Sequence, residues 1–326
     1  MNWTNALLPL VSGFLLSILA GLAVIPYLTR LKLGQHIREE GPKSHQKKAG
    51  TPTMGGMIFM AGTVLSVAIY RAVTRTLPPV EELLLLGLFI SYGFIGFLDD
   101  YRKVRLGRNL GLKAREKLAL QVLFAALFTW FFADRKTVLL PFLGGEFYLG
   151  LLYPLFVIFI IVGIGNGVNL LDGLDGLASG VLVIDLAAYA FVAYQGASAL
   201  GMDLSPLALA GVGSLLGFLV YNKHPAKVIM GDLGSLSLGA LLSGFAVATR
   251  TELVLLFLGA MPIIENLSVI LQVASFQLTG KRIFKMSPLH HHFELSGWKE
   301  TTVVYAFWSA AAVFAFIGIL SMAYVR

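Results

Sequence analysis

The sequence contains no cysteine, and only 13% of its 326 residues are charged. The absence of cysteine excludes disulfides, thiolate metal sites and cysteine nucleophiles. A soluble domain usually carries about 25% charged residues, whereas 57% of this chain is hydrophobic and its mean hydropathy is +0.78. The scarcity of charge therefore argues against a soluble protein.

Apolar runs of roughly 17–25 residues, long enough to cross a bilayer, recur along the whole chain. We predict an all-α polytopic membrane protein with about ten transmembrane helices, forming one integral-membrane domain over residues 1–326. A β-barrel would instead show short segments of alternating polarity. The predicted spans cover residues 6–29, 53–70, 83–98, 118–133, 151–165, 177–194, 205–221, 233–248, 253–274 and 302–325. Between the fourth and fifth spans, two apolar stretches around Gly144-Gly145 predict a small hairpin.

The basic residues indicate how the chain is oriented. Nineteen of the 25 Lys and Arg lie in the loops 30–52, 99–117, 222–232 and 275–301. By the positive-inside rule these loops are cytoplasmic, so both termini are expected to be periplasmic. The net charge of +7 is spread over short loops without a basic domain, so we expect no nucleic-acid partner.

The predicted cytoplasmic segments carry unusual carboxylates. Asp99 and Asp100 end the third predicted span, where carboxylates oppose the helix macrodipole and repel each other unless a cation intervenes. A hard divalent cation such as Mg²⁺ suits oxygen ligands and phosphate. The alternative is a solvated pair that binds Arg102 and Lys103.

Residues 165–180, GNGVNLLDGLDGLASG, indicate a polar ligand site. Asn166 and Asn169 are three residues apart, as are Asp172 and Asp175, so each pair shares a side if the segment is helical. Asp232 directly precedes the eighth predicted span, and a single Asp is also an ordinary helix cap.

Residues 50–56, GTPTMGG, open the second predicted span, with Thr and Pro as a helix start. Free N–H groups there would attract phosphate, helped by Lys47 and Lys48; the alternative is a capped helix whose glycines permit tight packing. The run His290–His292 suits phosphate binding, with zinc as a competing interpretation. Asp185, Glu265 and Gln272 lie within spans and fit either function or hydrogen bonds between helices.

Five motifs follow one another along the whole chain: GTPTMGG, FLDDYRK, NGVNLLDGLDGLASG, YNKHPAKVIMGDLGSLSLG and SPLHHHFELSGWKE. On these motifs the sequence resembles the bacterial phospho-N-acetylmuramoyl-pentapeptide transferases of the polyprenyl-phosphate N-acetylhexosamine-1-phosphate transferase superfamily. The HHHFE run favours this muramoyl branch over the GlcNAc-1-phosphate branch. Two positions depart from the family pattern, because Ile229 replaces a common Phe and Leu171 a more usual Thr.

The resemblance implies a Mg²⁺-dependent phosphoglycosyl transferase of the bacterial inner membrane, with its active site on the cytoplasmic face. It would transfer phospho-MurNAc-pentapeptide from UDP-MurNAc-pentapeptide to undecaprenyl phosphate. The products would be lipid I and UMP, in the first membrane step of peptidoglycan synthesis. A homodimer is compatible with the resemblance.

The resemblance also assigns roles to individual residues. It implies Asp232 as a Mg²⁺ ligand, with Asp99 as a second candidate ligand and as the favoured general base. The implied catalytic residues are Asp99, Asp100, Lys117, Asp232, His290 and His291. The implied substrate-binding residues are Lys48, Thr53, Asn166, Asn169, Asp172, Asp175, Asn222, Gln272 and His292.

Three alternatives remain open at the level of sequence. An ion-coupled transporter would use the aspartates as a cation path, although transporters place such residues near the bilayer midplane. An enzyme of the GlcNAc-1-phosphate branch would share the aspartates. For the transferase itself, direct attack by the lipid phosphate competes with a two-step reaction through an aspartyl intermediate.

Overall fold

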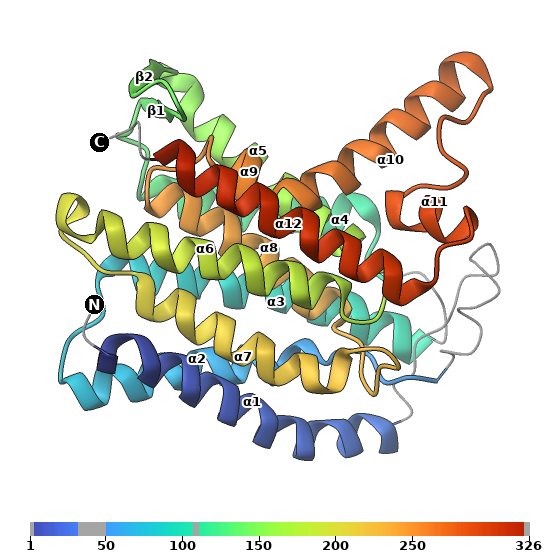
Figure 1. Ribbon diagram of the computed structural model, residues 1–326, viewed down its shortest axis with the longest axis horizontal. Helices are drawn as coiled ribbons and strands as arrows, with labels where there is room; N and C mark the ends of the chain where they lie inside the picture. The colour runs from blue at the N-terminus through green and yellow to red at the C-terminus, as the bar shows by residue number, and fades with distance from the viewer. Residues whose placement is uncertain (1–2, 32–49, 107–110, 323–326) are drawn as a thin grey trace.

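Long helices lie side by side in the computed structural model, which describes residues 3–31, 50–106 and 111–322 (Figure 1). Within these ranges, nine helices are long and apolar enough to cross a membrane. They are α1 (Trp3–Arg30), α2 (Gly56–Thr74), α3 (Val80–Leu106), α5 (Tyr153–Leu171), α6 (Leu177–Leu200), α7 (Ser205–Asn222), α8 (Gly231–Ala248), α10 (Ala260–Thr279) and α12 (Glu300–Met322). The prediction of an all-helical, multi-pass membrane protein is therefore confirmed.

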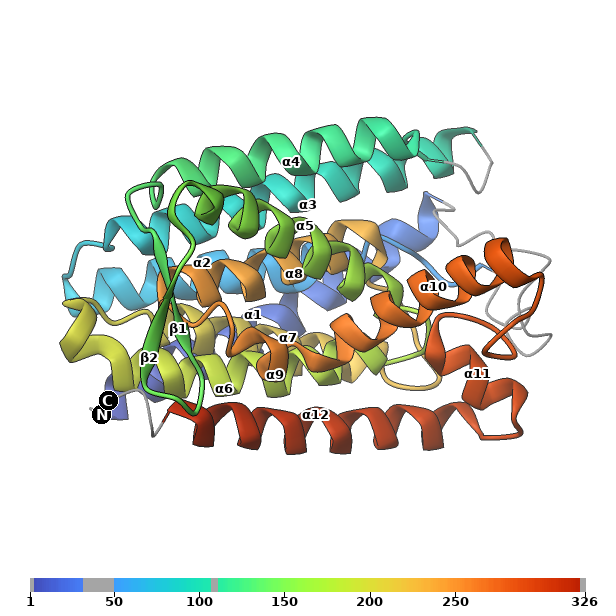
Figure 2. The same cartoon turned by 90° about the horizontal axis from the view of Figure 1, so that it is seen from above.

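The fourth predicted span, residues 118–133, corresponds to α4 (Ala114–Trp130), which has 17 residues and is not among these nine helices. A helix of this length is about 25 Å long, slightly less than the roughly 30 Å hydrocarbon core of a bilayer. It packs against α3 and α5, and it runs alongside α3 (Figure 2). α1 begins and α12 ends at the same end of the bundle (Figure 2), which is the arrangement that an even number of crossings produces.

The short elements lie between the long helices. β1 (Thr137–Leu140) pairs antiparallel with β2 (Gly145–Tyr148), which confirms the predicted hairpin. A 3-10 turn, η2 (Gly150–Leu152), leads into α5. The ninth predicted span is interrupted at Gly259, where α9 (Leu255–Leu258) gives way to α10. The histidine run forms the short helix α11 (Leu289–Leu295).

Two predicted helix boundaries were wrong in ways that affect the site. α3 continues to Leu106, so Asp99 and Asp100 lie about two turns before its end rather than at its terminus. The helix continues because basic residues, Lys103 among them, follow the aspartates and offset their charge. α2 begins at Gly56 with no side-chain cap, so the expected threonine cap is absent.

α8 lies at the centre of the bundle, packed against α3, α5, α2 and α6. All of its residues from 233 to 248 are buried. Many of them are Gly, Ala or Ser, which let helix backbones approach closely in a membrane; a methyl group at Gly239, for example, would lie 2.7 Å from the Cα of Gly165 in α5. This packing places Asp232, in the first turn of α8, among several helix ends.

Candidate functional site

Three carboxylates from two helices form an acidic centre, defined as Asp99 and Asp100 of α3 and Asp232 of α8. One oxygen from each lies within 4.8 Å of the others. Asp99 and Asp100 are each only 3% exposed. Buried carboxylates this close together repel one another, so the arrangement requires positive charge nearby.

Two lysines supply that charge. The Nζ atom of Lys103, one turn after the aspartates in α3, lies 2.6 Å from Asp99 and 3.0 Å from Asp232. Its distance to Asp100 is 3.6 Å. Lys117 of α4 lies 2.7 Å from the same Asp232 oxygen. The predicted pairing with Lys103 is therefore present.

The other predicted basic partner lies elsewhere. Arg102 contacts Glu116 at 3.3 Å on the protein surface. This difference follows from helical geometry, because consecutive side chains on a helix point about 100° apart.

Backbone and side-chain donors orient each carboxylate of the acidic centre. Leu233 N–H donates to Asp100 Oδ2 at 3.1 Å, and Leu112 N–H donates to Asp99 Oδ1 at 2.9 Å. The side-chain amide of Asn169 in α5 donates to Asp232 Oδ1 at 2.9 Å. Three helices and the start of a fourth thus converge on one polar point.

The acidic centre fits a hard divalent cation such as Mg²⁺. Its donors are all carboxylate oxygens, the ligand type that Mg²⁺ prefers. The Lys103 ammonium already lies among all three carboxylates, which identifies the position as one that favours a cation. A second group in the described part of the chain that could hold a metal, Asp175, His224 and Glu300, includes an imidazole and is less suited to Mg²⁺.

Asp172 caps the C-terminus of α5 next to the acidic centre. Burial raises its pKa well above the ordinary range, and the negative charges of Asp232 and Asp100 raise it further. The chain turns between α5 and α6 instead of continuing as a helix, so the condition under which Asp172 and Asp175 would share a helical side is not met. The turn allows the two carboxylates to serve different clusters.

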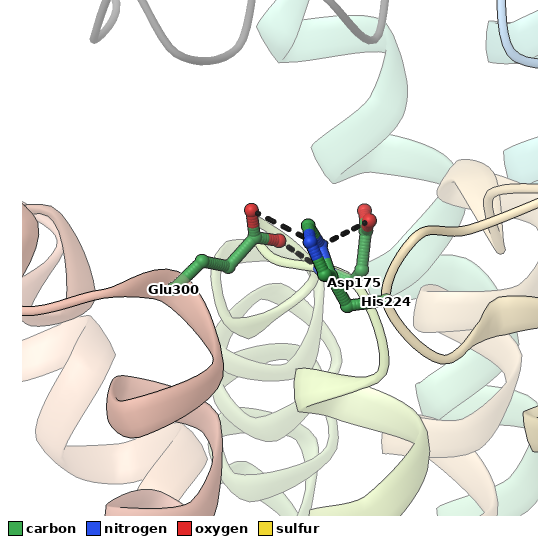
Figure 3. Close-up of side chains that lie close together, drawn as sticks. All are labelled: Asp175, His224 and Glu300. Carbon is green, nitrogen blue, oxygen red and sulfur yellow. Dashed lines mark hydrogen bonds and ion pairs between the residues drawn. The ribbon is translucent and has the colours of Figure 1, made fainter.

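Asp175 belongs to a second cluster, shown in Figure 3. Nδ1 of His224 lies between two carboxylates, 3.2 Å from Asp175 Oδ2 and 3.6 Å from Glu300 Oε2 (Figure 3). Asp175 N–H donates to Glu300 Oε1 at 2.9 Å, and Ala226 N–H donates to Asp175 Oδ2 at 3.0 Å. The cluster connects the first turn of α12 to the loops before α6 and after α7.

The three histidines of α11 have three different environments. His290 is 1% exposed, and its Nδ1 lies 3.0 Å from Oε1 of Glu265 in α10. His291 Nδ1 lies 2.9 Å from Glu294. His292 Nδ1 accepts the backbone N–H of Lys285 at 3.1 Å. Because the rings point to different partners, the zinc interpretation of the run has no support within the described residues.

Several other predicted site residues form hydrogen bonds away from the acidic centre. Asn166 exchanges hydrogen bonds with Gln121 of α4 at 3.0 and 3.3 Å. Asn222 accepts from the Ser179 hydroxyl and donates to the Val228 carbonyl.

Gln272 holds the segment after α10. Its side-chain oxygen accepts the N–H groups of Ile283 and Phe284, and its amide donates to the Phe284 carbonyl. These hydrogen bonds give Gln272 a structural role beside the substrate-binding role predicted from the sequence.

Segment 52–56 differs from the sequence prediction. Gly55 and Gly56 donate their N–H groups to the carbonyls of Ile229 and Met230, both at 2.9 Å, so these groups are not free for phosphate. Thr53 lies beside Gly231, at the start of α8. Lys48 lies outside the described residues.

Sequence reasoning missed residues that the structure brings into the two clusters. Lys103 was treated only as a neutralising partner, and His224 and Glu300 were not singled out. Their signal was present, since each lies in one of the loop segments predicted to be cytoplasmic, but a single sequence does not indicate which segments meet. Asp185, in contrast, was singled out from the sequence, yet neither cluster contains it. It is buried in α6, and its Oδ2 accepts no hydrogen bond from the described residues.

Comparison with known proteins identifies the family. Residues 83–250 match the model of glycosyl transferase family 4. The chain is 48% identical to the phospho-N-acetylmuramoyl-pentapeptide-transferase of Bacillus licheniformis over 316 residues, covering 96% of each chain. The enzyme of the same name from Heliobacterium modesticaldum is 51% identical over 307 residues, 93% of each chain, and that of Bacillus subtilis is 47% identical over 316 residues, 96% of each. With an acidic centre and two lysines at the ends of its helices, the chain thus belongs to the phospho-N-acetylmuramoyl-pentapeptide transferase family, within glycosyl transferase family 4.

Proposed function

We propose that this protein transfers phospho-MurNAc-pentapeptide from UDP-MurNAc-pentapeptide to undecaprenyl phosphate, giving lipid I and UMP. The reaction takes place at the cytoplasmic face of the bacterial inner membrane, in the first membrane step of peptidoglycan synthesis. The observation that carries the proposal is the acidic centre: within a chain of this family, three carboxylates and two ammonium groups converge at the helix ends. Phosphoryl transfer needs this combination of cation-binding oxygens and positive charge.

In this proposal Asp232 is a Mg²⁺ ligand, with Asp99 as a second candidate. Mg²⁺, when bound, offsets the negative charge of the diphosphate. Lys117 and Lys103 already contact Asp232 at 2.7 and 3.0 Å, so their ammonium groups are within reach of any phosphate held beside it. They would stabilise the charge that develops on the phosphoryl oxygens.

The preferred mechanism is direct attack. An oxygen of the lipid phosphate forms a bond to the β-phosphorus of the donor, and the bond from that phosphorus to the oxygen of the departing UMP breaks. A phosphate monoester has a second pKa near 6, so the acceptor is largely a dianion at neutral pH. Asp99 then removes a residual proton or, together with Asp100, orients the acceptor.

The remaining predicted residues are assigned to the nucleotide sugar. Asn169 and Asp172 lie at the acidic centre, which suits contacts to the diphosphate. We assign His290, whose ring faces Gly173, and His291 to the same group. The other predicted residues are proposed to bind the nucleotide or sugar: Lys48, Thr53, Asn166, Asp175, Asn222, Gln272 and His292. Ile229 provides no aromatic ring at the position where the resemblance implies a Phe.

The test is UMP release by the purified protein in detergent with Mg²⁺ and undecaprenyl phosphate. We expect lipid-dependent release with UDP-MurNAc-pentapeptide, none with UDP-GlcNAc, and a loss of at least about 100-fold in Asp232→Ala, the scale of one electrostatic group in a transfer site. Release with UDP-GlcNAc would move the protein to the sister branch. No release from folded protein with either donor would favour the transporter alternative.

The same preparation separates the one-step from the two-step reaction. Incubation with the donor alone, followed by mass spectrometry of the intact protein, would reveal a phospho-MurNAc-pentapeptide adduct if an aspartate acts as nucleophile. Direct attack predicts unmodified protein and no UMP release until the lipid phosphate is added.

A further inference from the structure

Glu265 of α10 is a fully buried acid, 0% exposed, that the proposed mechanism does not use. Its two oxygens make three hydrogen-bonding contacts, all with the start of α11. Leu289 N–H donates to Oε2 at 2.6 Å, and His290 N–H donates to Oε1 at 3.2 Å. The third contact is His290 Nδ1, 3.0 Å from Oε1.

These contacts determine which nitrogen of His290 carries the proton. An ionised carboxylate is an acceptor only, and a backbone N–H donor on each oxygen of Glu265 matches that form. Nδ1 must then be the donor, so in the neutral imidazole Nε2 holds the lone pair. A carboxylate that accepts a hydrogen bond from one ring nitrogen often fixes the tautomer, and leaves the other nitrogen as an acceptor.

The other nitrogen of His290 has no partner. Nε2 is buried and makes no hydrogen bond within the described part of the chain, which is costly for a polar atom unless a ligand completes it. Nε2 points at the turn between α5 and α6, where a methyl group added to Gly173 would collide with it. Gly173 directly follows Asp172, so Nε2 is presented beside the acidic centre.

We propose that Glu265 is a positioning residue for the transfer reaction, holding His290 with Nδ1 as donor so that Nε2 faces the phosphorylated part of the donor substrate at the Asp172–Gly173 turn. The neutral ring accepts a hydrogen bond there. When the ring is protonated, the Glu265 carboxylate balances its charge and Nε2–H donates to a phosphate oxygen. The role rests on the proposed transferase function, but the tautomer itself does not.

The decisive variant is Glu265→Gln. Glutamine has nearly the same size. With its carbonyl oxygen accepting the Leu289 N–H at the position of Oε2, its amide takes the position of Oε1 and donates to Nδ1, which then becomes an acceptor. We expect kcat to fall about 100-fold, within the range for a lost acid–base group, with KM and Tm close to those of the parent protein. Glu265→Asp keeps the charge and should recover part of the activity.

A double-mutant cycle with His290→Ala tests whether Glu265 acts through the ring. If it does, the Glu265→Gln/His290→Ala double variant is no worse than His290→Ala alone, whereas independent roles make the two losses multiply. Ser268→Ala is the matched control: Ser268 lies one turn along α10, is buried, and its hydroxyl donates to the Glu265 backbone carbonyl. It should keep parental activity.

Nitrogen-15 NMR of histidine-labelled protein gives a readout independent of activity. We expect the His290 signals, assigned by their loss in His290→Ala, to show a protonated Nδ1 and an unprotonated Nε2 at pH 8. A protonated Nε2 in the parent protein, parental activity in Glu265→Gln, or multiplicative losses in the cycle would each overturn the proposal. If the parent protein releases no UMP but shows the expected tautomer, the transferase function fails while the positioning by Glu265 stands.

Discussion

At the scale of single residues, Lys103 is the group on which the acidic centre depends. Its ammonium is the one that contacts all three carboxylates, whereas Lys117 contacts Asp232 alone among the described ion pairs. A carboxylate cluster that loses its shared cation either repels or takes up protons. The side chain of the neighbouring Arg102 is 47% exposed and, within the described ranges, pairs with Glu116.

Lys103→Met should therefore reduce kcat/KM by about 100-fold, because a charge directed at the transferring phosphoryl group is lost. Arg102→Met removes the same charge one residue away and should stay within about twofold, since exposed ion pairs contribute little. The measurement is steady-state UMP release at saturating Mg²⁺. Equal losses in the two variants would show that loop charge in general, and not the position of Lys103, matters.

Asp172 permits a prediction about pH. Burial, Asp232 and Asp100 raise its pKa in the folded state, so the folded protein retains a proton that the unfolded chain, with a pKa of about 3.9, has released. The free energy of unfolding then decreases as pH rises from about 4 toward the folded-state pKa.

Asp172→Asn mimics the protonated side chain and removes this cost. Its Tm should exceed the parental Tm by more at pH 8 than at pH 4.5, measured by thermal unfolding in detergent. Asp134→Asn, an exposed aspartate beyond the other end of α4, is the control and should give the same small difference at both pH values. A larger gain at pH 4.5 would contradict the assignment.

The sequence indicated candidate residues for the site more readily than the residues that each of them contacts. Polar residues such as Asn169 and Asp232 are conspicuous in a chain that is 57% hydrophobic, because burying a polar group without a hydrogen-bond partner costs free energy. Spacing along one helix, however, says nothing about the facing helix: Asn166 and Asn169 have the same spacing as a pair, yet one meets Gln121 and the other Asp232.

At the scale of secondary-structure elements, the site depends on how closely α3 and α8 approach. A methyl group at Gly96 of α3 would collide with the backbone carbonyl of Asp232. Backbone atoms cannot rotate away as a flexible side chain can, so the two helices would have to separate. Gly87 lies on the same helix and has no atom within 4 Å of an added methyl group.

We expect Gly96→Ala to destabilise the protein by about 1–3 kcal/mol, the usual cost of overpacking, and to impair turnover by displacing Asp232 from Asp100. Gly87→Ala should leave both properties unchanged or slightly raise Tm, since Ala favours a helix more than Gly. The measurements are Tm and UMP release of both glycine variants, compared with the parent protein. Parental behaviour of Gly96→Ala would mean that the helices separate without cost to the site.

Helices were predicted from apolar run length, and this succeeded because each run must satisfy its own backbone in a bilayer. Their ends were predicted less well because polar residues were taken as the limits of the spans. α3 and α5 each continue by six residues or more past the predicted ends at 98 and 165. Those extra turns carry Lys103 and Asn169, whose hydrogen bonds and ion pairs allow helix to persist through polar sequence.

At the scale of the whole molecule, the number of crossings and the side of the acidic centre are linked. If α4 crosses, the hairpin β1–β2 and the first residues of α4 lie on opposite sides of the membrane. The lysine and arginine distribution then assigns the acidic centre to the cytoplasm. Nothing in the apolar core distinguishes the two sides, so this assignment rests on loop charge.

Because the chain contains no cysteine, single-cysteine variants can test this directly in intact cells with a membrane-impermeant maleimide. Exposed positions on either side of α4 are Lys113 and Lys136, with Leu143 in the hairpin turn and Ser296 after α11. We expect Lys136→Cys and Leu143→Cys to react from outside, and Lys113→Cys and Ser296→Cys only after permeabilisation.

Each pattern of labelling has one structural meaning. Labelling of Lys113→Cys and Lys136→Cys on the same side would show that α4, with its 17 residues, does not cross. Complete inversion of all four positions would place the acidic centre outside, away from any cytoplasmic nucleotide sugar, and would remove the proposed donor substrate. The expected pattern places Asp99, Asp100 and Asp232 on the side where UDP-linked precursors are available, as the transfer reaction requires.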